Sequence, residues 1–198
     1  MTAEPADQLS TALEATQRVL AQVRDDQWTA PTPCTRWNVR DLVEHVVLGN
    51  FLYAHILHGQ PPAARDELLT PGRDLLDAYR DSATAVVGAF RQPGVLERLF
   101  TVPFGTVPGM VALHLRITEL LVHGWDLARA IGYPPDFPED IAEQELAFSR
   151  SKLADVPADR SPFAPPQAAP EGASAIDRLA ACLGRSVAAD MPTRGNPA

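Results

Sequence analysis

The chain has 198 residues, of which 45% are hydrophobic and 21% are charged, a balance that is typical of a globular domain and excludes a largely disordered or fibrous chain. Its formal net charge of -8 disfavours contact with phosphate backbones and anionic lipid surfaces, so we expect no nucleic-acid partner. The two cysteines, Cys34 and Cys182, lie far apart in the sequence, which excludes a Cys-x-x-Cys motif and a disulfide framework.

The N-terminal residues and the most apolar window both argue against a membrane segment. From Glu4 onward, acidic and amide side chains interrupt the apolar residues, so the start lacks the basic and continuously apolar parts of a signal peptide. The window from Leu42 to Leu57 contains two histidines, a glutamate and an asparagine, and is too polar and too short to cross a bilayer. We therefore expect a cytoplasmic protein without a membrane partner.

Four long helices are predicted from the spacing of apolar residues and from their end signals. The second is expected to begin at Asn38, a suitable N-cap with Asp41 three residues on, and to end before Gly59 and the Pro61-Pro62 pair. The fourth is expected to end at Gly132. The four expected ranges are 6–23, 38–58, 73–90 and 110–131.

The segments between these helices carry turn-forming residues. Pro31 and Pro33, together with three threonines, predict an extended loop over residues 25–37. Residues 96–108 combine β-branched and aromatic residues with glycine and proline, a pattern that suits an extended excursion or a short hairpin. We assign this second segment to a loop over one end of the bundle.

The C-terminal part is predicted to add short elements to the bundle. We expect a helix over residues 139–153, a linker or surface strap over 154–172, and a short terminal helix over 174–184. The fold class is therefore all-α, a four-helix bundle with short additional C-terminal helices, in one domain over residues 1–190. Residues 191–198 are expected to form a disordered tail, and the protein to be a monomer or a homodimer.

The fourth helix carries an acidic residue and a histidine on its apolar face. Glu119 and His123 are four residues apart, so both side chains project from the same side of the helix, between Leu115 and Leu127. A buried carboxylate must be paired, protonated or bound to a metal. A Glu-His hydrogen bond within the core and a metal site both satisfy this requirement, and the pair alone does not separate them.

The second helix offers a third ligand. His45 lies on an apolar stripe, in line with Leu48 and Leu52, although a single histidine there is more often a satisfied core residue. Two histidines and one carboxylate from facing helices form a three-ligand site for a divalent metal, for which we favour zinc, with a fourth position open. Iron, nickel or cobalt would suit the same ligands. The remaining histidines, His55, His58 and His114, are expected at the surface or rim.

Further candidates surround the three ligands. Asp126 is placed to orient His123 as a hydrogen-bond acceptor, and its alternative is an exposed ion pair with Arg129 or Arg116. Cys34 precedes the second helix, where we favour a small buried thiol over a role near the metal.

Five residues are considered for substrate binding. Arg36 and Arg40 suit a substrate carboxylate, and their alternative is solvated charge at the start of a helix. Trp37 and Trp125 would line a pocket, although packing is favoured for both. The segment from Val102 to Gly109 is considered as a lid, with Phe104 at the substrate, or as a plug of the bundle end. The lid requires the second and fourth helices to run parallel, so that both preceding loops share one end.

These motifs resemble a known family. The segment from Pro31 to His45, the Val102–Gly109 loop, the Glu119–Gly132 segment and the closing Arg178–Arg185 segment are similar to the mycothiol-dependent maleylpyruvate isomerase metal-binding domain, within the DinB-like superfamily. The resemblance implies a DinB-like four-helix bundle with its metal at His45, Glu119 and His123. The isomerase also has a second, C-terminal domain that contributes to its active site, for which we expect no room after Gly184.

The resemblance implies a function in which a small-molecule thiol, mycothiol, binds at the metal and an electrophilic substrate reacts with it. The protein would then be a zinc-dependent transferase or isomerase, because a thiol bound to zinc is deprotonated at neutral pH. Two alternatives keep the metal: a hydrolase that activates water, and a non-catalytic metal-binding bundle.

Overall fold

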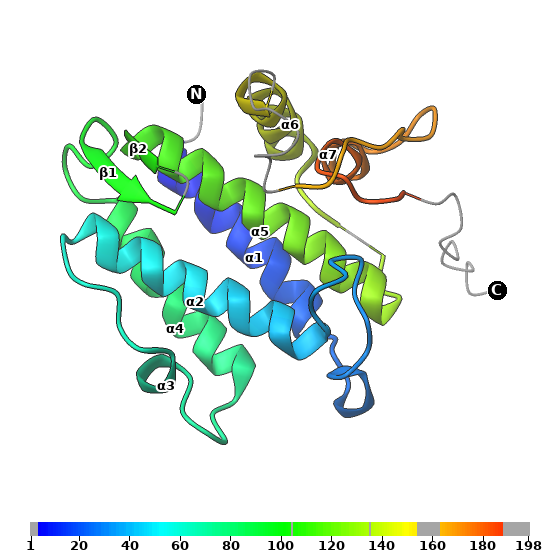
Figure 1. Ribbon diagram of the computed structural model, residues 1–198, viewed down its shortest axis with the longest axis horizontal. Helices are drawn as coiled ribbons and strands as arrows, with labels where there is room; N and C mark the ends of the chain where they lie inside the picture. The colour runs from blue at the N-terminus through cyan, green and yellow to red at the C-terminus, as the bar shows by residue number, and fades with distance from the viewer. Residues whose placement is uncertain (1–3, 104, 135, 154–162, 188–198) are drawn as a thin grey trace.

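The computed structural model describes residues 4–103, 105–134, 136–153 and 163–187. Four long helices form a bundle, and they are α1 Pro5–Leu20, α2 Val39–Leu57, α4 Leu75–Phe90 and α5 Gly109–Ile131 (Figure 1). Helix α1 packs along α5 and α2 packs along α4, and the two pairs face each other across a shared apolar core. The expected all-α four-helix bundle is confirmed.

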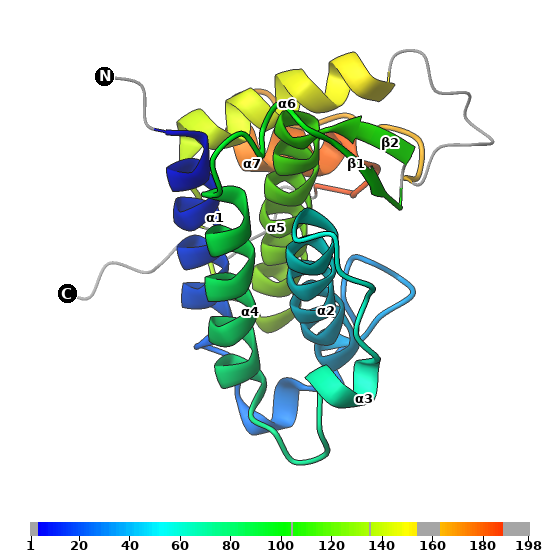
Figure 2. The same cartoon turned by 90° about the vertical axis from the view of Figure 1, so that its left-hand side faces the viewer.

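The helix directions place the bundle's loops at two different ends. Helices α1 and α5 run in one direction, and α2 and α4 run in the other (Figures 1 and 2). The connection from α2 to α4 therefore crosses the length of the bundle, and it contains the short helix α3 Arg65–Leu68. Strands β1 Leu99–Val102 and β2 Gly105–Pro108 form an antiparallel hairpin at the end where α5 begins. The segment that we assigned to a loop thus forms a short hairpin, one of the two forms that its composition suited, and it lies at one end of the bundle as expected. Helix α3 was not predicted.

The helix starts follow their capping residues. At α2, the side chain of Asn38 accepts from the Asp41 amide at 3.0 Å, and the carboxylate of Asp41 accepts from the Asn38 amide at 3.3 Å. Helix α4 starts two residues later than expected because the Asp74 side chain caps it. Helix α1 ends at Leu20, before a 3-10 turn, η1 Asp25–Gln27, and so is shorter than expected.

Two further helices cover one side of α5. Helices α6 Glu139–Leu153 and α7 Ala175–Cys182 pack on each other and on α5. Trp125 of α5 is fully buried, and its indole N–H donates to Asp177 of α7 at 2.8 Å, so packing is confirmed as its role. In the described part of the chain, no helix is long and apolar enough to cross a membrane. Residues 154–162 and the expected tail, 191–198, lie outside the described residues.

Helix α5 packs closely enough against its neighbours to require glycine at position 124. A Cβ atom there would lie 2.8 Å from the Phe137 ring and 2.8 Å from the hydroxyl oxygen of Thr16. We expect Gly124→Ala to lower the free energy of unfolding by about 1–3 kcal/mol, because the core would be overpacked. Gly88 in α4 is the matched control, since no atom lies within 4 Å of its added Cβ. Gly88→Ala should raise the stability by about 0.5–1 kcal/mol in the same urea titration. Equal effects of the two substitutions would contradict this packing.

Candidate metal centre

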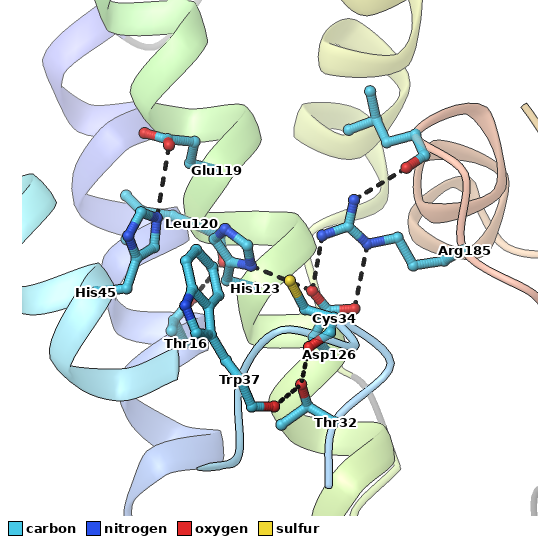
Figure 3. A network of polar contacts seen from close by, with 11 residues as sticks. Thr16, Thr32, Cys34, Trp37, His45, Glu119, Leu120, His123, Asp126 and Arg185 are labelled. Carbon is cyan, nitrogen blue, oxygen red and sulfur yellow. Dashed lines mark hydrogen bonds and ion pairs between the residues drawn. The ribbon is translucent and has the colours of Figure 1, made fainter. Parts of the chain in front are cut away.

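The three predicted ligands converge on one point between α2 and α5 (Figure 3). His45 Nε2 lies 3.8 Å from Glu119 Oε1, and one ligand atom from each of His45, Glu119 and His123 lies within 4.8 Å of the other two. The 3.8 Å separation is too long for a hydrogen bond. The side chains are 34%, 19% and 10% exposed respectively, so the group lies in the bundle wall with access on the His45 side.

Glu119 forms an ion pair with a buried arginine. Arg116, one turn earlier on α5, is fully buried and donates from Nη1 to Glu119 Oε2 at 3.1 Å. Gly49 of α2 makes room for this guanidinium, because a Cβ there would lie 2.2 Å from Arg116 Nη1. Burial favours a higher pKa for Glu119, but the charge of Arg116, followed by the nearby imidazoles, lowers the pKa below its ordinary value. The carboxylate is therefore ionised, with Oε1 directed toward His45.

His123 is held by the carboxylate of Asp126. His123 Nδ1 donates to Asp126 Oδ2 at 3.1 Å, and Asp126 is fully buried. Burial lowers the pKa of His123, although the Asp126 carboxylate opposes this effect, so the ring is neutral at neutral pH. With Nδ1 directed at Asp126, Nε2 faces His45 and Glu119 (Figure 3). The expected contact between Asp126 and His123 is thus present, and the expected alternative partners of Asp126 are replaced by Arg185.

The donor set suits a divalent metal ion. Two imidazole nitrogens and one carboxylate oxygen are ordinary zinc ligands, and neighbouring ligands of a tetrahedral zinc ion lie roughly 3.3 Å apart. A contraction of about half an ångström from the observed 3.8 Å between His45 and Glu119 would reach that spacing. Asp126 provides the carboxylate partner that metal-bound histidines commonly have. The alternative of a Glu119–His123 hydrogen bond is not adopted, because each of these residues has another partner.

A cavity of about 370 Å³ opens beside the three ligands. The loop before α2 forms one wall and contributes Cys34, Arg36 and Trp37. Trp37 stacks on His45, with the ring centroids 4.2 Å apart, so it both packs against a ligand and faces the cavity. A second part of the wall comes from Phe163, Ala164 and the segment after α7.

Cys34 lies near His123 and Asp126, and one ligand atom from each of the three is within 4.8 Å of the others. It therefore lies on the side of the His123 ring where Nδ1 meets Asp126 (Figure 3). Burial and the negative charge of Asp126 raise the pKa of the Cys34 thiol. Cys34 is thus a half-buried free thiol at the cavity wall.

The remaining residues singled out in the sequence have separate outcomes. Arg40 does not line the cavity, because its guanidinium lies over the Trp28 ring, 5.2 Å from the centroid. Phe104 lies outside the described residues. The expectation of a surface or rim position for His114 is wrong: its side chain is only 20% exposed and donates from Nδ1 to the buried Glu145 at 2.8 Å.

The expected lid over the site is also wrong for the described part of the hairpin. Helices α2 and α5 are antiparallel, so the hairpin before α5 lies at the opposite end of the bundle from the loop before α2 (Figure 1). None of the described hairpin residues lines the cavity. The cavity is lined instead by the loop before α2, the chain after α7, residues near Phe163 and the ligand-bearing helices.

Comparisons with known proteins decide the family. Residues 9–128, more than half of the chain, match the family model described as the mycothiol maleylpyruvate isomerase N-terminal domain. This chain belongs to that family. The matched residues run from α1 to Ala128, three residues before the end of α5, and include all three candidate ligands.

Two uncharacterized proteins of Mycobacterium tuberculosis are similar along nearly their whole length. They are MT0763 of strain CDC 1551 / Oshkosh and Rv0738 of strain ATCC 25618 / H37Rv. Each is 38% identical over 181 residues, which cover 89% of this chain and 94% of the relative.

Two solved structures of a family member share the fold. The crystal structure of the mycothiol-dependent maleylpyruvate isomerase matches with a TM-score of 0.57 and 23% identity, over 74% of this chain and 71% of that chain. A mutant of that isomerase, with one histidine replaced by alanine, matches with the same TM-score and 21% identity over the same shares. The DinB-like bundle expected from the sequence is therefore confirmed.

Two residues of the site in this family member were missed by sequence reasoning. Arg116 carries a recognisable signal, because it lies three residues before Glu119 on the same helix face and was considered only as a partner of Asp126. Arg185 carries none, since it is 59 residues from Asp126 in the sequence.

Proposed function

We propose that this protein binds one divalent metal ion, preferably zinc, through His45, Glu119 and His123, and uses it to bind the sulfur of a low-molecular-weight thiol. The observation that carries the proposal is the position of three inward-facing ligands in the wall of a cavity of about 370 Å³. Family membership indicates mycothiol as the thiol. The reaction would be transfer of the thiol to an electrophilic substrate or a thiol-dependent isomerisation.

The residues around the candidate ligands have separate roles in this proposal. When bound, zinc lowers the pKa of a coordinated thiol, so that the sulfur is a thiolate at neutral pH. Arg116 holds one oxygen of Glu119, which leaves the other oxygen for the metal. Asp126 holds the His123 ring so that Nε2 faces the site. Arg36 in the cavity wall offers a cation to a carboxylate of the substrate or thiol, and its guanidinium also lies 5.3 Å from the Trp37 ring centroid.

Hydrolysis by a metal-bound water is the second candidate, and the structure favours it less. Such a mechanism needs a general base near the water. Asp126, the buried carboxylate beside His123, does not offer one, because both of its oxygens are engaged by Arg185 and Oδ2 also accepts from His123. Its role in our proposal is therefore to hold His123.

A metal-dependent response to thiol tests the proposal. We expect zinc-loaded protein to gain thermal stability on adding mycothiol, by about 2.7 kcal/mol at 100 times the dissociation constant. The S-methylated form of the same thiol is the matched control, because it keeps the whole molecule and cannot form a thiolate. Chelated protein, measured in parallel, should show no response to either ligand.

The outcomes separate the three functions. A gain with the thiol alone, lost on chelation, supports thiol binding at the metal. An equal gain with the S-methylated form would contradict it, because binding would not depend on the sulfur. Metal binding without any response to thiol would favour a hydrolase or a non-catalytic metal protein, and the absence of metal binding would reject the centre itself.

A further inference from the structure

The chain after α7 forms part of the candidate site. A second wall of the cavity, besides the loop before α2, is lined by Leu183, Gly184 and Arg185 together with Phe163 and Ala164. All five lie beyond residues 9–128, the part of the chain that matches the family model. The metal ligands and this second wall therefore come from different parts of the sequence.

The second wall is fixed in place by close packing. Gly184 has φ +84°, and a Cβ there would lie 2.6 Å from the carbonyl oxygen of Ala164, so only glycine allows the two segments to approach in this way. The amide of Gln167 donates to the carbonyl of Ala181 at 2.8 Å. The Trp125–Asp177 hydrogen bond fastens α7 to the ligand-bearing helix α5. These contacts hold the residues that follow α7 against the centre.

Arg185 extends from this wall to Asp126. Its Nη2 donates to Asp126 Oδ2 at 2.9 Å, and its Nε donates to Oδ1 at 3.3 Å, so the guanidinium holds both carboxylate oxygens (Figure 3). The Arg185 side chain is 10% exposed, and Asp126 is fully buried. Its Nη1 donates to the Leu183 carbonyl at 2.9 Å, which fixes the guanidinium plane. Asp126 Oδ2 in turn accepts from His123.

We propose that Arg185 is a positioning residue of the metal centre, which fixes Asp126 and thereby the orientation of the His123 ring. The role rests on the proposed metal site, and it makes the segment after α7 part of that site. A guanidinium bound to both oxygens of a carboxylate fixes its plane as well as its position. Without Arg185, the buried carboxylate would lack a counter-charge and would turn toward water, so the ring of His123 would lose its fixed orientation.

The chain of contacts from Arg185 through Asp126 to His123 should also link metal binding to the docking of the chain after α7. Because equilibrium coupling is reciprocal, an ion that binds His123 in the orientation fixed by Arg185 must also stabilise the docked position of the chain after α7. We therefore expect metal to slow amide hydrogen exchange at Leu183 and Arg185 in the native protein. In Arg185→Gln, metal should not change exchange in this segment.

Cobalt titration of single variants tests the role of Arg185. We expect Arg185→Gln to weaken Co²⁺ binding by about 10- to 100-fold and to shift the visible absorption bands, because His123 would bind in altered geometry. Arg185→Lys should restore part of the affinity, since it keeps the charge and loses the two-point contact. Arg178→Gln is the matched control: Arg178 also belongs to the C-terminal part, but it pairs with Glu143 and Glu139 of α6.

A measurement on metal-free protein tests the role of Arg185 independently of metal binding. In chelated wild-type protein, nitrogen NMR should show the His123 proton on Nδ1, and Arg185→Gln should change these ring signals while Arg178→Gln should not. Wild-type protein that binds no Co²⁺ would reject the metal centre. Unchanged ring signals in Arg185→Gln, or unchanged Co²⁺ affinity and spectrum where the wild type binds, would overturn the role of Arg185.

Discussion

Replacing His123 with alanine is expected to lower zinc affinity by more than about 100-fold, beyond the effect typical of residues that only support a ligand. The same loss is expected for His45→Ala and Glu119→Ala, because in the proposed centre these three side chains supply all the protein ligands of one ion. Competition with a chromogenic chelator at pH 7 measures the affinity. Circular dichroism of each variant checks that the helices remain, since the apolar core of the bundle does not depend on these side chains.

Two histidines outside the centre are the controls for this experiment. His114→Ala should retain the metal, since His114 faces Glu145 and α6, although loss of a partner for the buried Glu145 should reduce stability. His58→Ala, at the exposed end of α2, should change neither property. Retention of zinc by His45→Ala together with its loss in His114→Ala would show that the ligands have been assigned wrongly.

The helices and the inward-facing positions of the three candidate ligands were predictable because they depend on local periodicity. Glu119 and His123 share a face simply because they are four residues apart on one helix, and the apolar stripe around each ligand indicated that they point into the bundle. His45 could be assigned in the same way on α2. These inferences needed only the phase of each helix and not the relative placement of the helices.

The direction of helix packing was not predictable in this way. The lid hypothesis required α2 and α5 to be parallel, and they are antiparallel because the α2–α4 connection crosses the whole bundle (Figure 2). Nothing in the periodicity of either helix specifies this choice. A connection of residues 58–74 is long enough to cross the bundle, so its length was the available signal.

The charge balance of the centre depended on contacts over long sequence separations. Arg185 reaches Asp126 across 59 residues, and Glu145 reaches Thr118 at the cavity wall across 27. The sequence showed that a buried carboxylate needs a partner, but not which of several polar residues supplies it. Packing of α6 and α7 onto α5 selects among them.

Arg116→Met is expected to lower the free energy of unfolding of the metal-free protein by about 3 kcal/mol, because it leaves the Glu119 carboxylate without its buried counter-charge. Arg116 is fully buried and pairs with Glu119 at 3.1 Å. Two further contacts are longer: Nη2 donates to the Val46 carbonyl at 3.5 Å, and the guanidinium lies 5.8 Å from the Tyr53 ring centroid. Urea denaturation in the presence of a chelator measures the loss. The double variant Arg116→Met/Glu119→Gln should recover much of it, since no unpaired charge remains.

The change in stability with pH distinguishes the loss of a counter-charge from simple damage to packing. In the wild type, Arg116 keeps the Glu119 pKa below its ordinary value near 4.5, so the stabilisation is present above that value and is lost as the pH falls through the lowered pKa. Without Arg116, burial is the dominant influence and raises the pKa, so the variant should recover stability as acid protonates the carboxyl group. The difference between wild type and Arg116→Met should therefore be largest at pH 7 and shrink toward pH 4. A stability difference between wild type and Arg116→Met that is constant with pH would mean that Arg116 acts through packing alone. A double variant that is no more stable than Arg116→Met would lead to the same conclusion.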